Sequence, residues 1–193
     1  MKYWFYALTK GCLRVIFRVG FGLEVRGQER VPTRGGFIVA SNHFSYLDPP
    51  VLGAACLRRL SFMARSGLFE LALVGAFMRA VHVIPLQRGE GDLEAIREAI
   101  ARLQAGEAVA IFPEGGRQFS GQLGRARRGV GLLAAAARVP IVPALLTGTF
   151  EALPPAGPQR LHRAKIRVAF GPVIPYTKLS VRPSRSHHQQ LAD

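Results

Sequence analysis

The sequence predicts a single α/β domain: a mixed sheet of about seven strands flanked by helices, with an N-terminal amphipathic helix. Short apolar runs alternate with helical patterns along the 193 residues, without a long linker or an internal repeat. Such alternation is typical of a sheet that is at least partly parallel. The length is typical of one domain and is sufficient for a substantial core.

The composition is both basic and apolar. Lys and Arg number 26 against 12 Asp and Glu, the formal net charge is +14, and 49% of the residues are hydrophobic. This surplus indicates an anionic partner: nucleic acid, a phosphorylated ligand or anionic lipid. The sequence has no zinc-finger spacing and no RNP-like motif, which disfavours nucleic acid. Basic and hydrophobic character together favour a membrane surface. Cys12 and Cys56 lack the spacing of a metal site, a redox site or a disulfide framework.

Residues 1–22 have the pattern of an amphipathic helix. Lys10, Arg14 and Arg18 lie four residues apart on one face. Apolar residues recur at helical spacing on another face: Trp4, Phe5, Leu8, Cys12, Val15, Ile16 and Val19. Three cations argue against a membrane-spanning helix, and Lys10 interrupts the apolar region that a secretory signal would need. We expect the helix to lie in the interface of an anionic membrane. The alternative is that it packs on its own domain or on a partner chain.

Residues 23–176 are expected to form the α/β domain, and the basic residues 177–193 a loosely ordered tail. The expected strands are residues 23–26, 37–41, 60–64, 81–85, 109–112, 141–147 and 166–170. The expected helices are residues 51–58, an apolar segment at 68–79 interrupted by Gly75, and residues 130–138.

A further amphipathic helix is expected between Asp92 and Gly106. Asp92 is expected to cap it, and Gly106 to stop it. Its expected buried face consists of Leu93, Ile96, Ile100 and Leu103.

The loop after strand 37–41 contains a histidine and a carboxylate. His43 follows the strand, and Asp48 precedes two prolines at the expected start of the next helix. Histidine is suited to accept a proton near neutral pH, and a carboxylate can fix its tautomer and stabilise the imidazolium. Asp48 could instead cap the helix entered at Pro49. The spacing alone does not decide between catalysis and capping.

Two other strand ends carry charged groups. Glu114, Gly115 and Arg117 follow strand 109–112, and Arg88 follows strand 81–85. In an open α/β sheet, the carboxyl ends of the strands converge on one crevice. Arginine suits phosphate because the guanidinium group binds it with two parallel hydrogen bonds. A histidine base beside such a site indicates deprotonation of an alcohol on a phosphorylated substrate. The sequence has no G-x-S-x-G nucleophile elbow and no P-loop.

Four blocks stand in order along the sequence: Asn42–Asp48, Val83–Arg88, Phe112–Arg117 and Val139–Pro143. Together they resemble the glycerolipid acyltransferase family, with the 1-acyl-sn-glycerol-3-phosphate acyltransferases as the nearest branch. The resemblance covers most of the chain, from about Val25 to Pro175.

The resemblance implies roles for these residues. His43 would be the general base on the free hydroxyl of a lysophospholipid, with Asp48 as its orienting partner. Arg88 and the loop containing Glu114, Gly115 and Arg117 would hold the acceptor's phosphate. Within that loop, Glu114 would orient an arginine rather than touch the phosphate.

The resemblance also implies an enzyme that makes phosphatidic acid from 1-acyl-glycerol-3-phosphate. The acyl donor would be acyl-CoA or acylated acyl carrier protein. The enzyme would need no metal or bound cofactor. It would act as a peripheral protein on the cytoplasmic face of a membrane. Gly116 and Gln118 replace the Thr and Ser common in the family, which leaves other acceptors open: a lyso-ornithine lipid or a lysophospholipid with a larger head group. From a different class, the alternative is a non-catalytic protein that binds anionic lipid or nucleic acid.

Overall fold

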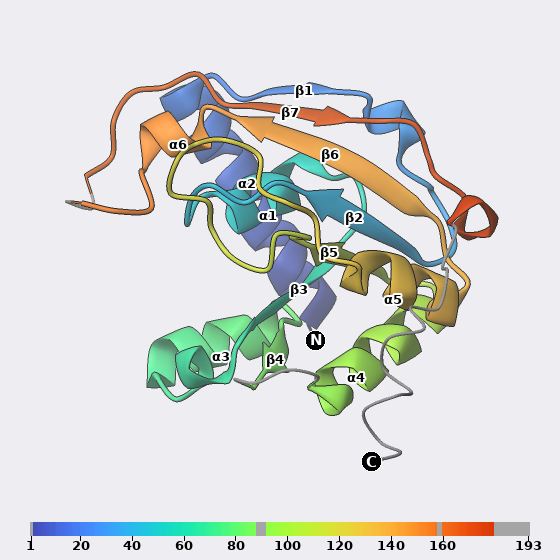
Figure 1. Ribbon diagram of the computed structural model, residues 1–193. Helices are drawn as coiled ribbons and strands as arrows, with labels where there is room; N and C mark the ends of the chain where they lie inside the picture. Colours follow the sequence, from blue (N-terminus) through green and yellow to red (C-terminus); the bar gives the residue numbers. More distant parts are fainter. Residues whose placement is uncertain (1, 88–91, 158–159, 180–193) are drawn as a thin grey trace, which may run out of the picture.

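The computed structural model describes residues 2–87, 92–157 and 160–179 (Figure 1). Within these residues, seven strands form one mixed sheet in the order β1-β7-β6-β2-β5-β3-β4. The strands are β1 (Glu24–Arg26), β2 (Phe37–Ser41), β3 (Leu60–Arg65), β4 (Ile84–Leu86), β5 (Ala108–Ile111), β6 (Ile141–Thr147) and β7 (Arg167–Phe170). The α/β class and the mixed sheet are therefore confirmed.

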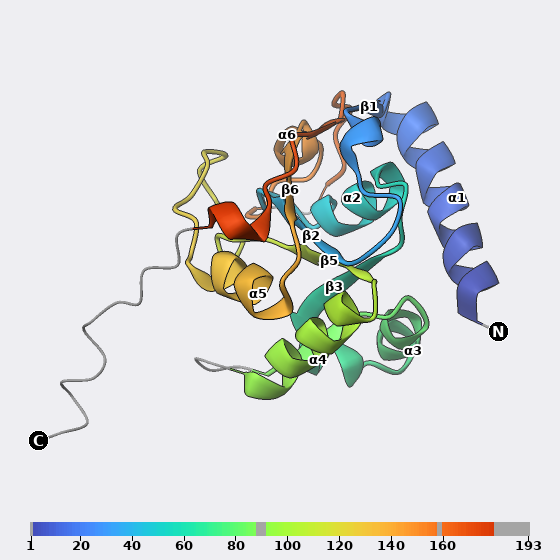
Figure 2. The same ribbon diagram turned by 90° about the vertical axis from the view of Figure 1, so that its right-hand side faces the viewer.

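Helices cover both faces of the sheet, giving three layers (Figure 2). One face carries α1 (Lys2–Phe21) and α2 (Asp48–Ala55), and the other carries α4 (Leu93–Gln104) and α5 (Gly129–Ala137). The remaining helical elements are α3 (Ala72–Ala80), α6 (Thr149–Ala152) and the 3-10 turns η1 (Gln28–Arg30), η2 (Ser66–Phe69) and η3 (Tyr176–Lys178).

The middle of the sheet is parallel. β2 pairs in parallel with both β5 and β6, and β3 pairs in parallel with β5 and β4. β7 is antiparallel to β6, and β1 is parallel to β7. The carboxyl ends of β2 to β6 consequently lie along one edge of the sheet, where ligands bind in folds of this type.

Strand alternation divides the core into two halves. Phe37 and Val39 of β2 pack with α1 and α2, whereas Ile38 packs with α4 and α5. All three side chains are fully buried. A strand covered on both faces is a near-continuous apolar run, which explains why β2 could be recognised from sequence.

Helix α1 has two apolar sides. One side packs on the domain through Leu13, Phe17 and Phe21, and Tyr6 Oη accepts a hydrogen bond from Leu60 N at 3.0 Å. The other side is exposed and consists of Trp4, Leu8, Cys12, Val15, Ile16 and Val19. Most of the face predicted for lipid is therefore solvent-exposed, while a second stripe anchors the helix to its own domain. Phe5, also predicted on the lipid face, is only partly exposed and lies edge-on against Phe77.

No helix among the described residues is both long and apolar enough to cross a membrane. The two cysteines are free, Cys12 exposed and Cys56 buried. Burial raises the pKa of the Cys56 thiol to about 11, so this thiol stays protonated at neutral pH.

Two predicted elements differ in extent. The segment 68–79 is divided into η2 and α3, and Gly75 lies inside α3 rather than interrupting it. Gly75 is buried against the backbone of Phe69, where a methyl group would overlap, so glycine allows the turn to fold onto the helix. The predicted strand 81–85 begins only at Ile84, because His82 has a φ of 62° and the residues before β4 continue the α3 terminus through hydrogen bonds.

Two predicted helices are also corrected. α2 begins at Asp48 and ends at Ala55, three residues earlier than expected at each end. In α4 the Asp92 cap is confirmed by a hydrogen bond from Ala95 N at 3.0 Å. Its buried residues are Ala95, Ala99 and Leu103, whereas Leu93 and Ile96 are exposed. Half of the expected face is therefore confirmed, because Leu103 is buried and Ile100 packs partly buried against the core. The small side chains of Ala95 and Ala99 form the rest of the buried face in place of Leu93 and Ile96. Of the predicted tail, residues 180–193 lie outside the described residues.

Gly36 provides a test of this packing. A Cβ atom on Gly36 would overlap the carbonyl of Leu103 at the end of α4, whereas one on Gly67 would meet open space. We expect Gly36→Ala to lower the free energy of unfolding by about 1–3 kcal/mol, measured by denaturant titration. Gly67→Ala is the matched control and should change it by less than about 0.5 kcal/mol. Equal effects would contradict the packing of β2 against α4.

Candidate active site

His43 and Asp48 meet at the carboxyl end of β2. His43 lies two residues beyond the end of β2, and Asp48 is the first residue of α2. His43 Nδ1 lies 2.9 Å from Asp48 Oδ2. This contact favours the tautomer in which Nδ1 carries the proton and Nε2 can accept one. The predicted pair is therefore in direct contact, and Nε2 is the nitrogen available to a substrate.

The Asp48 carboxylate turns back to the loop rather than forward into α2. The side chain is 0% exposed, and Oδ2 also accepts hydrogen bonds from Phe44 N and Ser45 N, both at 2.6 Å. A capping carboxylate would accept from N–H groups further along the helix. The N-cap position belongs instead to Leu47, which makes no side-chain cap. The capping alternative is therefore wrong for Asp48.

The loop after β5 wraps around the loop after β2 (Figure 1). The imidazole of His43 stacks on Phe112, with ring centroids 4.1 Å apart and planes at 20°. The His43 carbonyl accepts a hydrogen bond from Gln118 N at 2.8 Å. The ring of His43 is therefore held on one face by Phe112 and at Nδ1 by Asp48, which leaves it a single orientation.

Glu114 joins these loops through backbone groups. Its side chain is buried, Oε2 accepts from His43 N at 3.0 Å, and Oε1 accepts from Gly124 N at 3.1 Å. The structure thus gives Glu114 partners other than the expected arginine. Its carboxylate positions the backbone of His43 and closes the loop between β5 and α5.

Two further polar side chains fix the loop after β2. Asn42 pairs with Leu146 of β6 as a neighbouring strand would, donating to its carbonyl at 2.9 Å and accepting from its N–H at 2.8 Å. Ser45 Oγ is buried and donates to the Leu153 carbonyl at 2.7 Å. Both side chains are thus engaged with the backbone, and the Ser45 hydroxyl is not available as a nucleophile.

Arg117 lies over the same loop with a free hydrogen-bond donor. Its guanidinium carbon is 3.5 Å from the centroid of the Tyr46 ring. The Arg117 Nη1 atom is buried and has no hydrogen-bond partner within the described residues. A buried donor of this kind is unfavourable without an acceptor, and a phosphate oxygen is an acceptor that the guanidinium geometry suits.

Gly115 sits directly beneath a second arginine. Its φ of 73° favours glycine, and a Cβ atom there would lie 2.8 Å from Arg127 Nε. The Arg127 backbone N–H donates to the Pro113 carbonyl at 2.8 Å. Arg127 therefore packs against the turn that carries Arg117, a role that was not predicted from the sequence.

The two departures from the family pattern have different surroundings. Gly116 faces open space, so a threonine side chain would fit there. Gln118 Nε2 donates to the Gly116 carbonyl at 3.2 Å, and its amide lies against Gly124. The loop is thus held by Gln118, and room is left above Gly116.

The third predicted arginine, Arg88, lies outside the described residues. A different arginine ends a strand at this edge: Arg65 is the last residue of β3 and is exposed. β3 is two strands from β2, about 10 Å across the sheet. The signal in the sequence for Arg65 was its position directly after the strand predicted at residues 60–64. Within the described residues no three His, Cys, Asp or Glu side chains gather as a metal site would need.

Comparison with known proteins identifies the family. A family model described as Acyltransferase matches residues 22–147, more than half of the chain. The chain belongs to the acyltransferase family. It is an enzyme, and the match contains both site loops described above.

Several acyltransferases resemble this one over most of its length. The 1-acyl-sn-glycerol-3-phosphate acyltransferase of Bacillus subtilis is 28% identical over 181 residues, covering 93% of this chain and 87% of the relative. A chloroplastic protein of the same name from Arabidopsis thaliana is 28% identical over 164 residues, covering 83% of this chain and 46% of the relative. The chain therefore spans most of the bacterial protein and about half of the plant one.

A solved structure shares the fold of this acyltransferase. The 1-acyl-sn-glycerophosphate (LPA) acyltransferase PlsC of Thermotoga maritima superimposes with a TM-score of 0.82 at 23% identity. The match covers 93% of this chain and 72% of that one. It bears out the α/β architecture derived from the sequence.

The role of Glu114 can be tested through stability. Glu114→Gln places an amide nitrogen against one of two backbone N–H donors, leaving a buried donor unpaired. We expect a loss of about 1–3 kcal/mol in the free energy of unfolding, measured by denaturant titration. The exposed Glu151 provides the control, and Glu151→Gln should have little effect. An unchanged stability in Glu114→Gln would contradict the loop-joining role.

Proposed function

We propose that this acyltransferase moves a fatty acyl group from an acyl thioester to the free hydroxyl of 1-acyl-glycerol-3-phosphate, giving phosphatidic acid. The observation that carries the proposal is the geometry of His43, whose Nδ1 is 2.9 Å from the buried Asp48 while Nε2 stays available. The names of the Bacillus and Arabidopsis relatives support the same acceptor.

The reaction needs one base and no covalent enzyme intermediate. His43 Nε2 takes the proton of the acceptor hydroxyl as its oxygen attacks the thioester carbonyl. The tetrahedral intermediate collapses as the carbon–sulfur bond breaks, and the imidazolium returns the proton to the departing thiolate. Asp48 stabilises the imidazolium and keeps the ring oriented between these two transfers. No metal or bound cofactor takes part in this scheme.

The phosphate of the acceptor would bind beside this base. Arg117 supplies the unpaired Nη1 donor, and Arg127 lies on the same turn. Arg88 is included from its position in the sequence. Gly115 lets the Arg127 side chain lie close to the backbone of the turn, because a Cβ atom at this position would be 2.8 Å from Arg127 Nε. Glu114 contributes indirectly by holding the turn against His43.

Acyl-CoA and acylated acyl carrier protein both present the required thioester, and we propose one of them as donor. We further propose a peripheral position on the cytoplasmic face of a membrane. The exposed apolar stripe of α1, which contains Leu8, Val15 and Val19, supports this location because it would be covered by lipid.

A second acceptor class is favoured by one observation. The open space above Gly116 would admit a head group larger than phosphate alone. A lyso-ornithine lipid or another lysophospholipid is therefore the second candidate acceptor, with the same base and the same donor.

The proposed reaction is tested by thiol release from acyl-CoA or from acylated acyl carrier protein, with lysophosphatidic acid present or absent. We expect release that requires lysophosphatidic acid and falls at least about a hundredfold in His43→Ala, because the general base is lost. His162→Ala is the matched control, since His162 is exposed, and it should retain activity within about twofold. Full activity in His43→Ala would refute the proposed base. Acceptor-dependent release only with a larger lyso-lipid would favour the second acceptor class.

The phosphate contact is tested separately with Arg117→Lys. Lysine keeps the charge but lacks the planar fork that stacks on Tyr46 and binds phosphate with two bonds. We expect the KM for lysophosphatidic acid to rise about tenfold, with the KM for the acyl donor unchanged. Arg125→Lys, at an exposed arginine of the same loop, should leave both values near those of wild type. A change confined to the donor's KM would contradict the assignment.

A further inference from the structure

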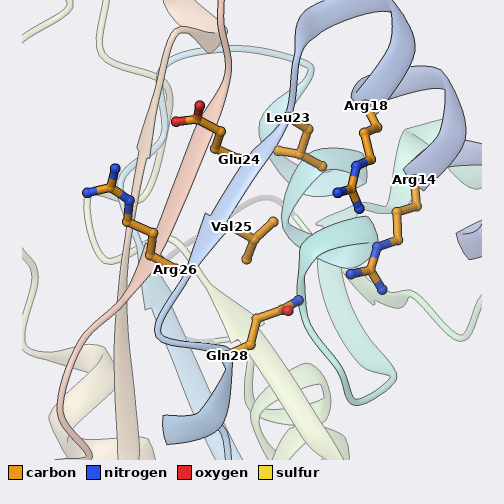
Figure 3. Close-up of a pocket in the computed structure, with 7 residues that line it drawn as sticks. All are labelled: Arg14, Arg18, Leu23, Glu24, Val25, Arg26 and Gln28. Carbon is orange, nitrogen blue, oxygen red and sulfur yellow. The ribbon is translucent and has the colours of Figure 1, made fainter.

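A hollow of about 380 Å³ lies between α1 and β1 (Figure 3). Its walls come from the last turns of α1, the segment that enters β1 and the start of η1. The lining residues are Arg14, Arg18, Leu23, Glu24, Val25, Arg26 and Gln28. The three arginines make its charge positive, and none of the loops that carry His43 or Arg117 contributes to it.

Two of these arginines project together. Arg14 and Arg18 are one helical turn apart, so their side chains start from the same face of α1. Figure 3 shows both guanidinium groups extending from α1 toward β1 and Gln28. Glu24 and Arg26 extend from the other side of β1. The inward charge of the hollow therefore belongs to Arg14 and Arg18.

The carboxylate in this lining does not neutralise these arginines. Glu24 pairs with Lys165, and its Oε2 is 3.2 Å from Arg167 Nε. The contact with Lys165 also lowers the pKa of Glu24, which keeps the carboxylate ionised and engaged on that side. Among the described residues, Arg14 and Arg18 form no ion pair and donate no hydrogen bond. The hollow thus presents two guanidinium groups that have no anion.

The hollow adjoins the exposed apolar stripe of α1. Val15 and Val19 each follow one of the two arginines along the helix, and they are 62% and 81% exposed. A bilayer that covers this stripe would bring its phosphate groups to the level of Arg14 and Arg18. Guanidinium binds a phosphate with two parallel hydrogen bonds, and its aliphatic stem can lie along apolar surface.

We propose that Arg14 and Arg18 form a binding site for the phosphate head group of an anionic membrane lipid. The site is separate from the acceptor site at Arg117. It would hold α1 on the bilayer in one orientation about the helix axis. This inference deepens the proposed function, because it rests on the peripheral membrane location given there.

The test is cosedimentation of the full chain with phosphatidylcholine vesicles, with and without about 30 mol% of the anionic lipid phosphatidylglycerol. An arginine near an anionic surface contributes about fivefold to binding. We expect Arg14→Gln/Arg18→Gln to bind the anionic vesicles about 30-fold more weakly than wild type. Arg14→Lys/Arg18→Lys should also bind more weakly, by about fivefold, because lysine retains the charge but not the bidentate geometry.

Arg34→Gln/Arg97→Gln is the control for net charge, since both arginines are exposed and lie outside α1 and the hollow. It should bind within about twofold of wild type. Binding by the lysine variant equal to wild type would overturn the site, because charge alone would then suffice. An equal loss in the control pair would overturn it as well.

Two arms separate this inference from its alternatives. Glycerol phosphate without vesicles should raise the melting temperature of wild type and of Arg14→Gln/Arg18→Gln equally. A rise found only in wild type would assign the hollow to a soluble phosphate and overturn the lipid assignment. Thiol release by the wild-type protein in detergent measures the proposed reaction without vesicles. If no thiol is released, the proposed reaction is refuted, but the vesicle-binding comparison can still be interpreted.

Discussion

The contact between Asp48 and His43 is the constraint on which the site depends. A fully buried carboxylate is unfavourable unless it accepts hydrogen bonds, and Asp48 accepts three at Oδ2, from His43, Phe44 N and Ser45 N. Its Oδ1 has no hydrogen-bond partner among the described residues, so the contacts of Oδ2 hold the charge. The loop after β2 must therefore close around its own aspartate. That closure presents the backbone of His43 to Glu114 and thereby draws in the loop after β5. One buried charge thus determines how two loops meet.

Much of this architecture follows from local sequence. Strands such as residues 141–147 are continuous apolar runs, and the Asp92 cap and the His43–Asp48 pair each involve residues close in the chain. The differences come from packing between distant segments. The partners of Glu114 lie 71 residues and 10 residues away, and alanine spacing in α4 gives no sign of which face will be buried. The direction of the Asp48 carboxylate depended on backbone N–H groups that the side-chain pattern does not reveal.

Helix α1 combines two features that were predicted as alternatives, an exposed apolar stripe and a side that packs on its own domain. The apolar pattern predicted a lipid-facing stripe, and packing on the domain was the alternative. Phe17 is 4% exposed and Val19 is 81% exposed, two residues apart on the same helix. A helix held so firmly by its own domain would position any bound bilayer relative to the sheet. In the proposed lipid site, Arg14 and Arg18 would then determine how α1 is rotated about its axis on the bilayer, which the apolar stripe alone does not fix.

The most direct measurement is a crystal structure of the protein with lysophosphatidic acid bound in the absence of an acyl donor. The proposed mechanism predicts the free hydroxyl about 2.6–3.2 Å from His43 Nε2, with the phosphate on the Arg117 guanidinium. That result would place the reacting oxygen and the base in one geometry. An ordered ligand whose hydroxyl lies beyond hydrogen-bond reach of His43, with its phosphate away from Arg117, would contradict the mechanism.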